Sequence, residues 1–304
     1  MDFVLTLYAA LLVIFSALLH AGWNILGKSN SGSGYSFTLG AALSQCLLLA
    51  PFMVWCFVQI GFSNVSAYFW GLLGLSAIGQ VIYLVGLLNA YKHGDIGVIY
   101  PIARALPVLM VGVGAWFIGQ SLGVSAWVGF AILTLGCLLV PIKTFRQLTV
   151  SAYANLGVLW AFVAAIGTTI YSIVDKEGIN WLMFETSELT PHHIAILYLG
   201  LQTAGISVLL VLWLLVTRQF EQLSLTWKYK RQSSIAGVMM GLTYGIVLFA
   251  MTMVENVSYV VALRQVSIIF GVFMGMWFLK EPWLNTRILG VVLVSAGLVI
   301  ALAI

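Results

Sequence analysis

Charged residues are scarce in this sequence of 304 residues. Lys and Arg number 13 and Asp and Glu number 9, so 7% of the chain is charged and 62% is hydrophobic. A typical soluble domain is about 25% charged. So little polar surface cannot face water, which excludes an ordinary soluble domain. The net charge of +4 comes without a basic patch interleaved with aromatic residues, so we expect no nucleic-acid partner.

Cysteine and buried acid are also scarce. Cys46, Cys56 and Cys137 lie singly in apolar runs, with neither disulfide nor metal-ligand spacing. We interpret them as small core residues and expect no metal and no cofactor. Asp95 and Glu255 are the acidic residues nearest to the apolar runs, and both fall at expected helix ends. The sequence therefore predicts that no carboxylate lies inside a membrane span.

Apolar runs of about 20 residues, long enough to cross the hydrocarbon core, recur along the whole chain. They stay apolar throughout instead of alternating, which excludes a transmembrane β-barrel. The first run lacks a preceding basic region, so we expect a membrane helix there and no cleaved signal. The sequence predicts an all-α integral membrane protein. Its ten transmembrane helices are expected at Phe3–Gly27, Tyr35–Ile60, Ser66–Ala90, Asp95–Ile118, Leu122–Ile142, Ala152–Asp175, His192–Val216, Ser233–Glu255, Val257–Leu279 and Leu284–Ile304.

Basic residues are distributed unevenly between the connections, which indicates an orientation. The even-numbered connections hold one, Lys176, together with several acidic residues. We therefore expect the odd-numbered connections in the cytoplasm and both termini on the periplasmic or extracellular side. The odd-numbered connections hold ten basic residues: Lys28, Lys92, Lys143, Arg146, Arg218, Lys228, Lys230, Arg231, Lys280 and Arg287.

Two stretches of the first half resemble stretches of the second. Residues 17–30 align with 164–177, and RALPVLMVGVGAWF at 104–117 aligns with RQVSIIFGVFMGMWF at 264–278. The second alignment sets Arg104 against Arg264. An odd number of helices per repeat inverts the second copy, as in many secondary transporters. We therefore expect two inverted five-helix repeats, at 1–147 and 148–304.

The whole chain resembles the EamA-type branch of the drug/metabolite transporter superfamily. That resemblance implies transport of a small molecule or metabolite, often export, through a central cavity between the repeats. Many EamA proteins have a Trp-Gly pair where this chain has Gly22-Trp23-Asn24. The features that carry the likeness are Trp23 to Lys28, the aromatic ends Trp116-Phe117 and Trp277-Phe278, and the bacterial-type pair of motifs HAxWN (His20 to Asn24) and LRQVS (Leu263 to Ser267).

Arg104 is the most informative residue for function. It lies nine residues beyond Asp95, about 14 Å into a core of about 30 Å. A central arginine costs about 2.5–3.5 kcal/mol on insertion scales and cannot lose its charge. It could be solvated by neutral groups, by cavity water or by an anionic group of a substrate. The alternative is structural, with Arg104 bonded to carbonyls freed by Pro101 and Pro107 and Arg264 reaching its interface.

His20 is the only histidine in the interior of an expected span, away from its ends, and its charge can change near neutral pH. It is a candidate for proton coupling, for a substrate hydrogen bond, or for a structural bond to a neighbouring helix. The candidate substrate-binding residues are Arg104, Arg264, His20, Trp23, Asn24, Tyr100, Tyr171 and Gln265. Tyr83 and Tyr244 are weaker candidates for lining the same site.

Other functional classes fit the sequence less well. His20-x-x-x-Asn24 and Gly74 to Ala77 superficially resemble pieces of an intramembrane serine protease, but no second histidine lies in a late helix. We therefore expect no enzyme. In a channel or a membrane scaffold, a pair of arginines at repeat-related positions, Arg104 and Arg264, would have no evident role. We expect a transporter, monomeric or dimeric in the bacterial inner membrane, for an organic anion or zwitterion such as an amino acid or phosphonate-like metabolite. Uncharged or hydrophobic metabolites are the alternative cargo.

Overall fold

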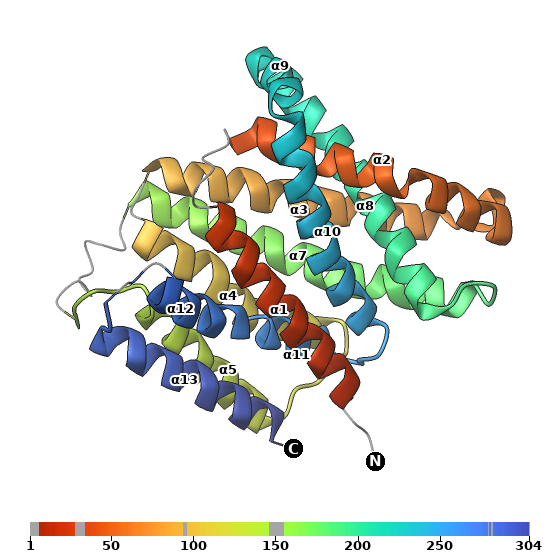
Figure 1. Cartoon of the computed structure of the whole chain (residues 1–304). Coiled ribbons are helices and arrows are strands. Elements are labelled where there is room, and N and C mark those ends of the chain that lie inside the picture. Colours follow the sequence, from red (N-terminus) through yellow and green to blue (C-terminus); the bar gives the residue numbers. More distant parts are fainter. Residues whose placement is uncertain are drawn as a thin grey trace.

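The computed structural model describes residues 6–27, 34–93, 96–145, 155–278, 280 and 282–303. All regular secondary structure in these ranges is helical, and the long helices cross one another in a single bundle (Figure 1). The helices are α1 (Leu7–Gly27), α2 (Gly34–Ile60), the 3-10 turn η1 (Phe62–Asn64), α3 (Ala67–His93), α4 (Ile96–Phe117), α5 (Val124–Leu139), α7 (Leu156–Glu185), α8 (Pro191–Val216), α9 (Phe220–Lys228), α10 (Lys230–Met251), α11 (Val257–Leu263), α12 (Val266–Phe278) and α13 (Asn285–Leu302).

The chain is an α-helical, multi-pass membrane protein. Within the described ranges, 7 helices are long and apolar enough to cross a bilayer, counting α11 and α12 together. Shorter apolar stretches at Leu7–Gly22, Ile102–Phe117 and Val124–Leu139 fall in α1, α4 and α5. Each of the ten ranges expected from sequence overlaps one of these helices. That all ten cross the membrane remains a prediction.

Helix α7 is longer than the sequence predicts. Asn155 caps its start, accepting a hydrogen bond from the backbone nitrogen of Val158 at 3.0 Å. The charges at 175–177 suggest a helix end, yet the helix continues to Glu185. Asp175 is 0% exposed and Lys176 is 4% exposed. The expectation of no carboxylate inside the spans is therefore wrong, because neighbouring helices supply hydrogen bonds that let this carboxylate be buried.

The ninth expected helix is interrupted in the middle. Residues 264 and 265 form a turn between α11 and α12. Here Gln265, Ser267 and Ile268 donate their backbone N–H groups three residues back, so the ladder tightens locally. The turn carries Arg264 itself, and broken helices of this kind mark binding sites in many transporters.

The packing interleaves the two halves of the chain. α3 lies along α7, α10 along α1, α2 along α8, and α5 along α13 (Figure 1). Glycine permits these close approaches, since a methyl group added at Gly167 of α7 would clash with the backbone nitrogen of Tyr83 of α3. The glycines at 237 and 241, which could have served a dimer, pack against α2 of the same chain.

The outer surface of the bundle is apolar. Leu47 and Val58 of α2 are 72% and 73% exposed, as a surface facing lipid requires. Trp116 and Trp277, near the ends of α4 and α12, are also exposed. Tryptophan at helix ends is typical of the membrane–water interface.

We predict that replacing Gly297 with alanine destabilises the contact between α5 and α13. The added methyl group would lie 2.5 Å from the backbone nitrogen of Leu133 and 2.6 Å from the carbonyl oxygen of Gly129. Overpacking of this kind costs about 1–3 kcal/mol. We expect a lower melting temperature in detergent. Gly71→Ala is the matched control, because a methyl group there meets nothing within 4 Å, and an equal effect of both substitutions would contradict the prediction.

Candidate functional site

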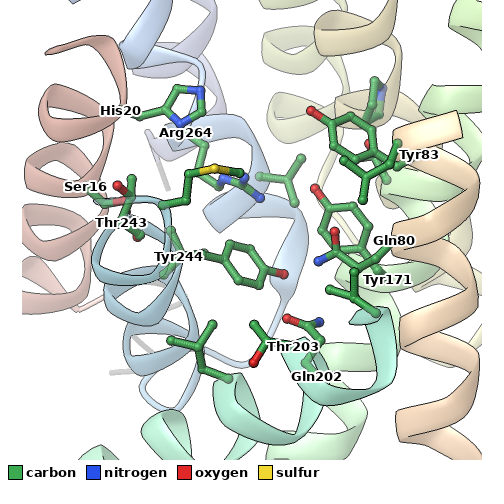
Figure 2. Close-up of a pocket in the computed structure, with 18 of the residues that line it drawn as sticks. Ser16, His20, Gln80, Tyr83, Tyr171, Gln202, Thr203, Thr243, Tyr244 and Arg264 are labelled. Carbon is green, nitrogen blue, oxygen red and sulfur yellow. Dashed lines mark hydrogen bonds between the residues drawn. The ribbon is translucent and has the colours of Figure 1, made fainter. Parts of the chain in front are cut away.

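A cavity of about 170 Å³ lies between the helices and is lined by residues from both halves of the chain (Figure 2). Its walls are largely apolar, with polar groups from separate helices converging on the space. The polar side chains that line it are Ser16, His20, Thr38, Gln45, Gln80, Tyr83, Arg104, Thr168, Tyr171, Gln202, Thr203, Thr243, Tyr244, Arg264, Gln265 and Ser267. Such a mixture is usual for small-molecule sites.

Arg104 of α4 is bonded across the cavity to two other helices. Its Nη1 donates to Nε2 of His20 at 2.9 Å, and its Nη2 donates to Oγ of Ser267 at 2.6 Å. Because arginine can only donate, Nε2 of His20 is the acceptor and the ring is neutral in this arrangement. Both partners are neutral groups, which is one of the kinds of solvation that the sequence allows for Arg104. His20 therefore holds the guanidinium in place on one side of the cavity.

Arg264 enters the cavity from the turn between α11 and α12. Its guanidinium carbon lies 5.4 Å from the centre of the Tyr244 ring, a cation–π contact. Tyr171 lies close to the same guanidinium, on the wall of the same cavity. Tyr171 packs edge to face against both Tyr83 and Tyr244, with ring centroids 6.0 Å apart in each of the two pairs. Arg264 thus faces the cavity rather than a membrane interface.

The structure brings most of the candidate residues together. Arg104, Arg264, His20, Tyr171 and Gln265 all line the cavity. So do Tyr83 and Tyr244. The side chains of Trp23, Asn24 and Tyr100 lie outside the described part of the structure.

Beside the cavity, four side chains donate hydrogen bonds to the buried carboxylate of Asp175. Ser76 of α3 and Tyr244 of α10 each donate a short bond. Gln202 of α8 donates from Nε2 at 2.9 and 2.8 Å, and Tyr198 of α8 donates at 3.1 Å. Sequence reasoning missed this cluster, because Asp175 was placed at a helix end. A helical continuation as apolar as INWLMF after residue 178 was the available signal.

The cavity and the carboxylate cluster share a wall. Tyr244 and Gln202 line the cavity and also donate to Asp175, which does not itself line it. Among the described lining residues there is no Asp or Glu, so the fixed charges facing the cavity are the two arginines. The cavity is therefore electropositive, with a negative charge one residue behind its wall.

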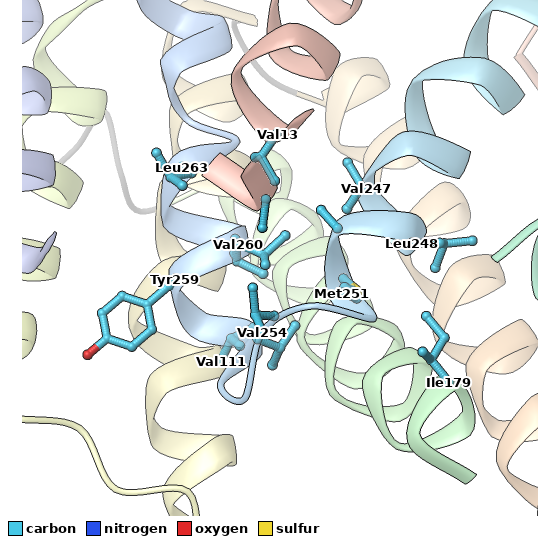
Figure 3. Close-up of a cluster of buried hydrophobic side chains, with 14 of the residues drawn as sticks. Val13, Val111, Ile179, Val247, Leu248, Met251, Val254, Tyr259, Val260 and Leu263 are labelled. Atoms are coloured by element: carbon cyan, nitrogen blue, oxygen red, sulfur yellow. The ribbon is translucent and has the colours of Figure 1, made fainter. Parts of the chain in front are cut away.

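The cavity lies in the middle of the bundle. It is nearer the basic connections on α2, which contributes residues 38–45 from its first half, and on α3, which contributes residues 80–84 from its second half. On α10 its lining residues fall in the middle and second half of the helix, and the last of them, Val247, is about 25 Å along the helix from Lys230. Beyond it, buried apolar side chains of α1, α4, α7, α10 and α11 fill the bundle (Figure 3). We call this cluster, which includes Val13, Val111, Leu248, Met251, Val254 and Val260, the apolar seal.

Comparison with known proteins establishes the fold. No family model matches the sequence, and no curated protein matches it. A solved crystal structure, described simply as that of a protein, superposes on this chain with a TM-score of 0.67. The match covers 97% of both chains at 13% sequence identity. At that identity the likeness defines the architecture and carries no function with it.

We predict that Ser76→Ala destabilises the bundle. The substitution removes one donor to a carboxylate that is sealed from water, and a hydrogen bond to a charged group contributes about 1.5–3 kcal/mol. The melting temperature in detergent should fall. Ser295→Ala is the control, because that exposed serine bonds only its own helix, at 2.9 Å to the Val291 carbonyl. A smaller effect at Ser76 than at Ser295 would contradict this prediction.

Proposed function

We propose that this protein is a secondary transporter that carries a small organic anion or zwitterion by alternating access. The proposal places it in the EamA-type branch of the drug/metabolite transporter superfamily, in a bacterial inner membrane. The observation that carries it is the cavity itself, in which two arginines from separate helices face a space without an acidic lining residue among the described ones. Transport changes no covalent bond, and we propose no enzymatic step.

The helix contacts support an inverted repeat. If α1 to α3 of the first half correspond to α7, α8 and α10 of the second, the contact of α3 with α7 exchanges with that of α10 with α1. In the same way, α4 on α7 exchanges with α12 on α1. The pairs α2 with α8 and α5 with α13 map onto themselves. A two-fold relation of this kind gives a carrier two similar states with opposite openings.

The buried position of Lys176 supports the proposed orientation. It was the one basic residue assigned to an even-numbered connection, but it lies inside α7 and donates from Nζ to the carbonyl of Met251 at 2.9 Å. Without it, the even-numbered connections hold no basic residue. We therefore propose that the cavity opens toward the cytoplasm, with both termini outside and the apolar seal on the outer side.

The charge of the cavity supports an anionic or zwitterionic cargo. Guanidinium groups bind carboxylate, phosphonate or sulfonate through two parallel hydrogen bonds. Arg104 donates hydrogen bonds to two neutral partners, His20 and Ser267, and a charged group of the substrate would replace them. A lipophilic cation fits less well, because the oxygens of the buried Asp175 carboxylate already accept hydrogen bonds from four donors behind the wall.

An uncharged metabolite is the second candidate. The edge-to-face tyrosines at 83, 171 and 244 form an aromatic wall that could hold a ring by shape alone. In that case the arginines would tie helices together instead of binding cargo.

A thermal-shift screen separates these candidates. We expect an anion or zwitterion, for example glutamate or methylphosphonate, to raise the melting temperature of the wild-type protein in detergent, because it binds only the folded state. Arg104→Gln should lose that rise while Arg218→Gln, a change at an exposed arginine outside the cavity, should keep it.

Two outcomes would count against the proposal. Equal stabilisation of wild type and Arg104→Gln by neutral aromatic compounds would favour the uncharged cargo. Stabilisation by tetraphenylphosphonium alone would exclude an anionic cargo.

A further inference from the structure

We propose that Asp175 is the proton-binding residue through which this protein couples transport to a proton gradient. The inference rests on the proposed transport function and deepens it by naming the coupling ion and its site. It starts from a carboxylate that is completely buried in the bundle yet separated from the cavity by a single layer of side chains.

The cluster around Asp175 suits the ionised carboxylate and would change on protonation. The donors come from α3, α8 and α10, so one group on α7 holds three other helices. A protonated carboxyl group accepts fewer hydrogen bonds and has a proton of its own to donate. Proton binding would therefore release or reverse at least one of these contacts. Helices that move in alternating access would be loosened at the point where they meet α7.

Tyr244 connects this cluster to the cavity. Its hydroxyl donates to Asp175, its ring lies against the guanidinium of Arg264, and its side chain forms part of the cavity wall (Figure 2). An anion that binds Arg264 would compete with the ring for the guanidinium. Movement of that ring would change the hydrogen bond to Asp175. Substrate and proton would thus act on one side chain.

The charged and polar groups around Asp175 can be named helix by helix. On its own helix, Lys176 donates to the Met251 carbonyl, and Tyr171 lies close to the guanidinium of Arg264. From the helices packed against α7, the facing groups are Ser76 on α3, Tyr198 and Gln202 on α8, and Tyr244 on α10, with Arg264 beyond Tyr244. Arg104 on α4 is directed to His20 and Ser267. The negative charges of Glu177 and Glu255 lie near Lys176 and attract its ammonium group. Within the described part of the chain Asp175 forms no salt bridge, and the side chains that donate to it are all neutral.

Two side chains connect the cavity to Asp175. Gln202 and Tyr244 each line the cavity and donate to Asp175, so a single side chain separates the carboxylate from the cavity. His20 is the rival site. Its Nε2 already accepts from Arg104, and a proton there would break that bond and add a second positive charge beside it.

Cysteine labelling tests the proposal without a known substrate. A reporter, Thr203→Cys, is placed in the cavity wall of a chain whose three native cysteines are replaced, and the protein is reconstituted in liposomes. A membrane-impermeant thiol reagent is added on the side of the basic connections, at mildly alkaline and mildly acidic pH. We expect a several-fold change in labelling rate with pH, corrected for the reactivity of a free thiol. In Asp175→Asn, which keeps hydrogen bonding but cannot ionise, the pH dependence should be lost.

The controls decide where the proton binds. His20→Gln and Glu188→Gln, a change at an exposed acid in the connection after α7, should keep the pH dependence. A dependence that persists in Asp175→Asn, that is absent in the reporter chain, or that vanishes only in His20→Gln would overturn the proposal.

Two further measurements keep the test decisive. If Asp175→Asn does not fold, Tyr244→Phe is the second variant, because it keeps the ring against Arg264 and removes the hydroxyl that donates to Asp175. We expect this variant to displace the midpoint of the pH dependence of labelling. An unchanged midpoint would count against the proposal.

Infrared difference spectra on acidification should show the C=O stretch of a protonated buried carboxyl in wild type. Because none of these measurements uses a substrate, they can fail while anions still stabilise the protein, and the thermal-shift screen can fail while they succeed.

Discussion

Burial of the Asp175 carboxylate is the constraint on which the arrangement of the inner helices depends. No water reaches it, so an ionised carboxylate there is stable only where protein donors replace the lost hydration. Those donors must come from neighbouring helices at short range. The close approach of α3 to α7, which Gly79 and Gly167 permit, brings Ser76 within bonding distance. The close packing of these two helices is therefore also what supplies the carboxylate with one of its donors.

Charges of opposite sign lie on the two sides of the cavity wall. Two arginines face the cavity, and the negative charge lies behind Tyr244 and Gln202. Arg104 uses neutral partners, which a carboxylate or phosphonate can replace at little loss.

Sequence reasoning located the cavity's arginines because a fixed charge in an apolar run is conspicuous, and their burial follows from helix rise alone. It also named His20, Tyr171 and Gln265 as candidates, and the structure brings all three to the cavity. It failed at Asp175, where the triplet DKE resembles a helix end in water. Whether such a triplet is buried depends on Ser76, Tyr198, Gln202 and Tyr244, which lie far away in sequence. The break at residues 264 and 265 was missed for a similar reason, since no Gly or Pro marks it.

Opening the apolar seal costs free energy, which the binding of a ligand or a proton must offset. Opening the far side would expose residues such as Val254 and Met251 to water, at roughly 25 cal/mol per Å² of apolar surface. A ligand or proton shifts such an equilibrium only by the difference in its affinity for the two states. That difference must arise at groups whose contacts change. Tyr244 lies within about one helical turn of Val247 and Leu248, at the edge of the seal, while it bonds Asp175 and faces Arg264. Its position allows changes at the cavity and at the carboxylate to reach the seal through a single helix.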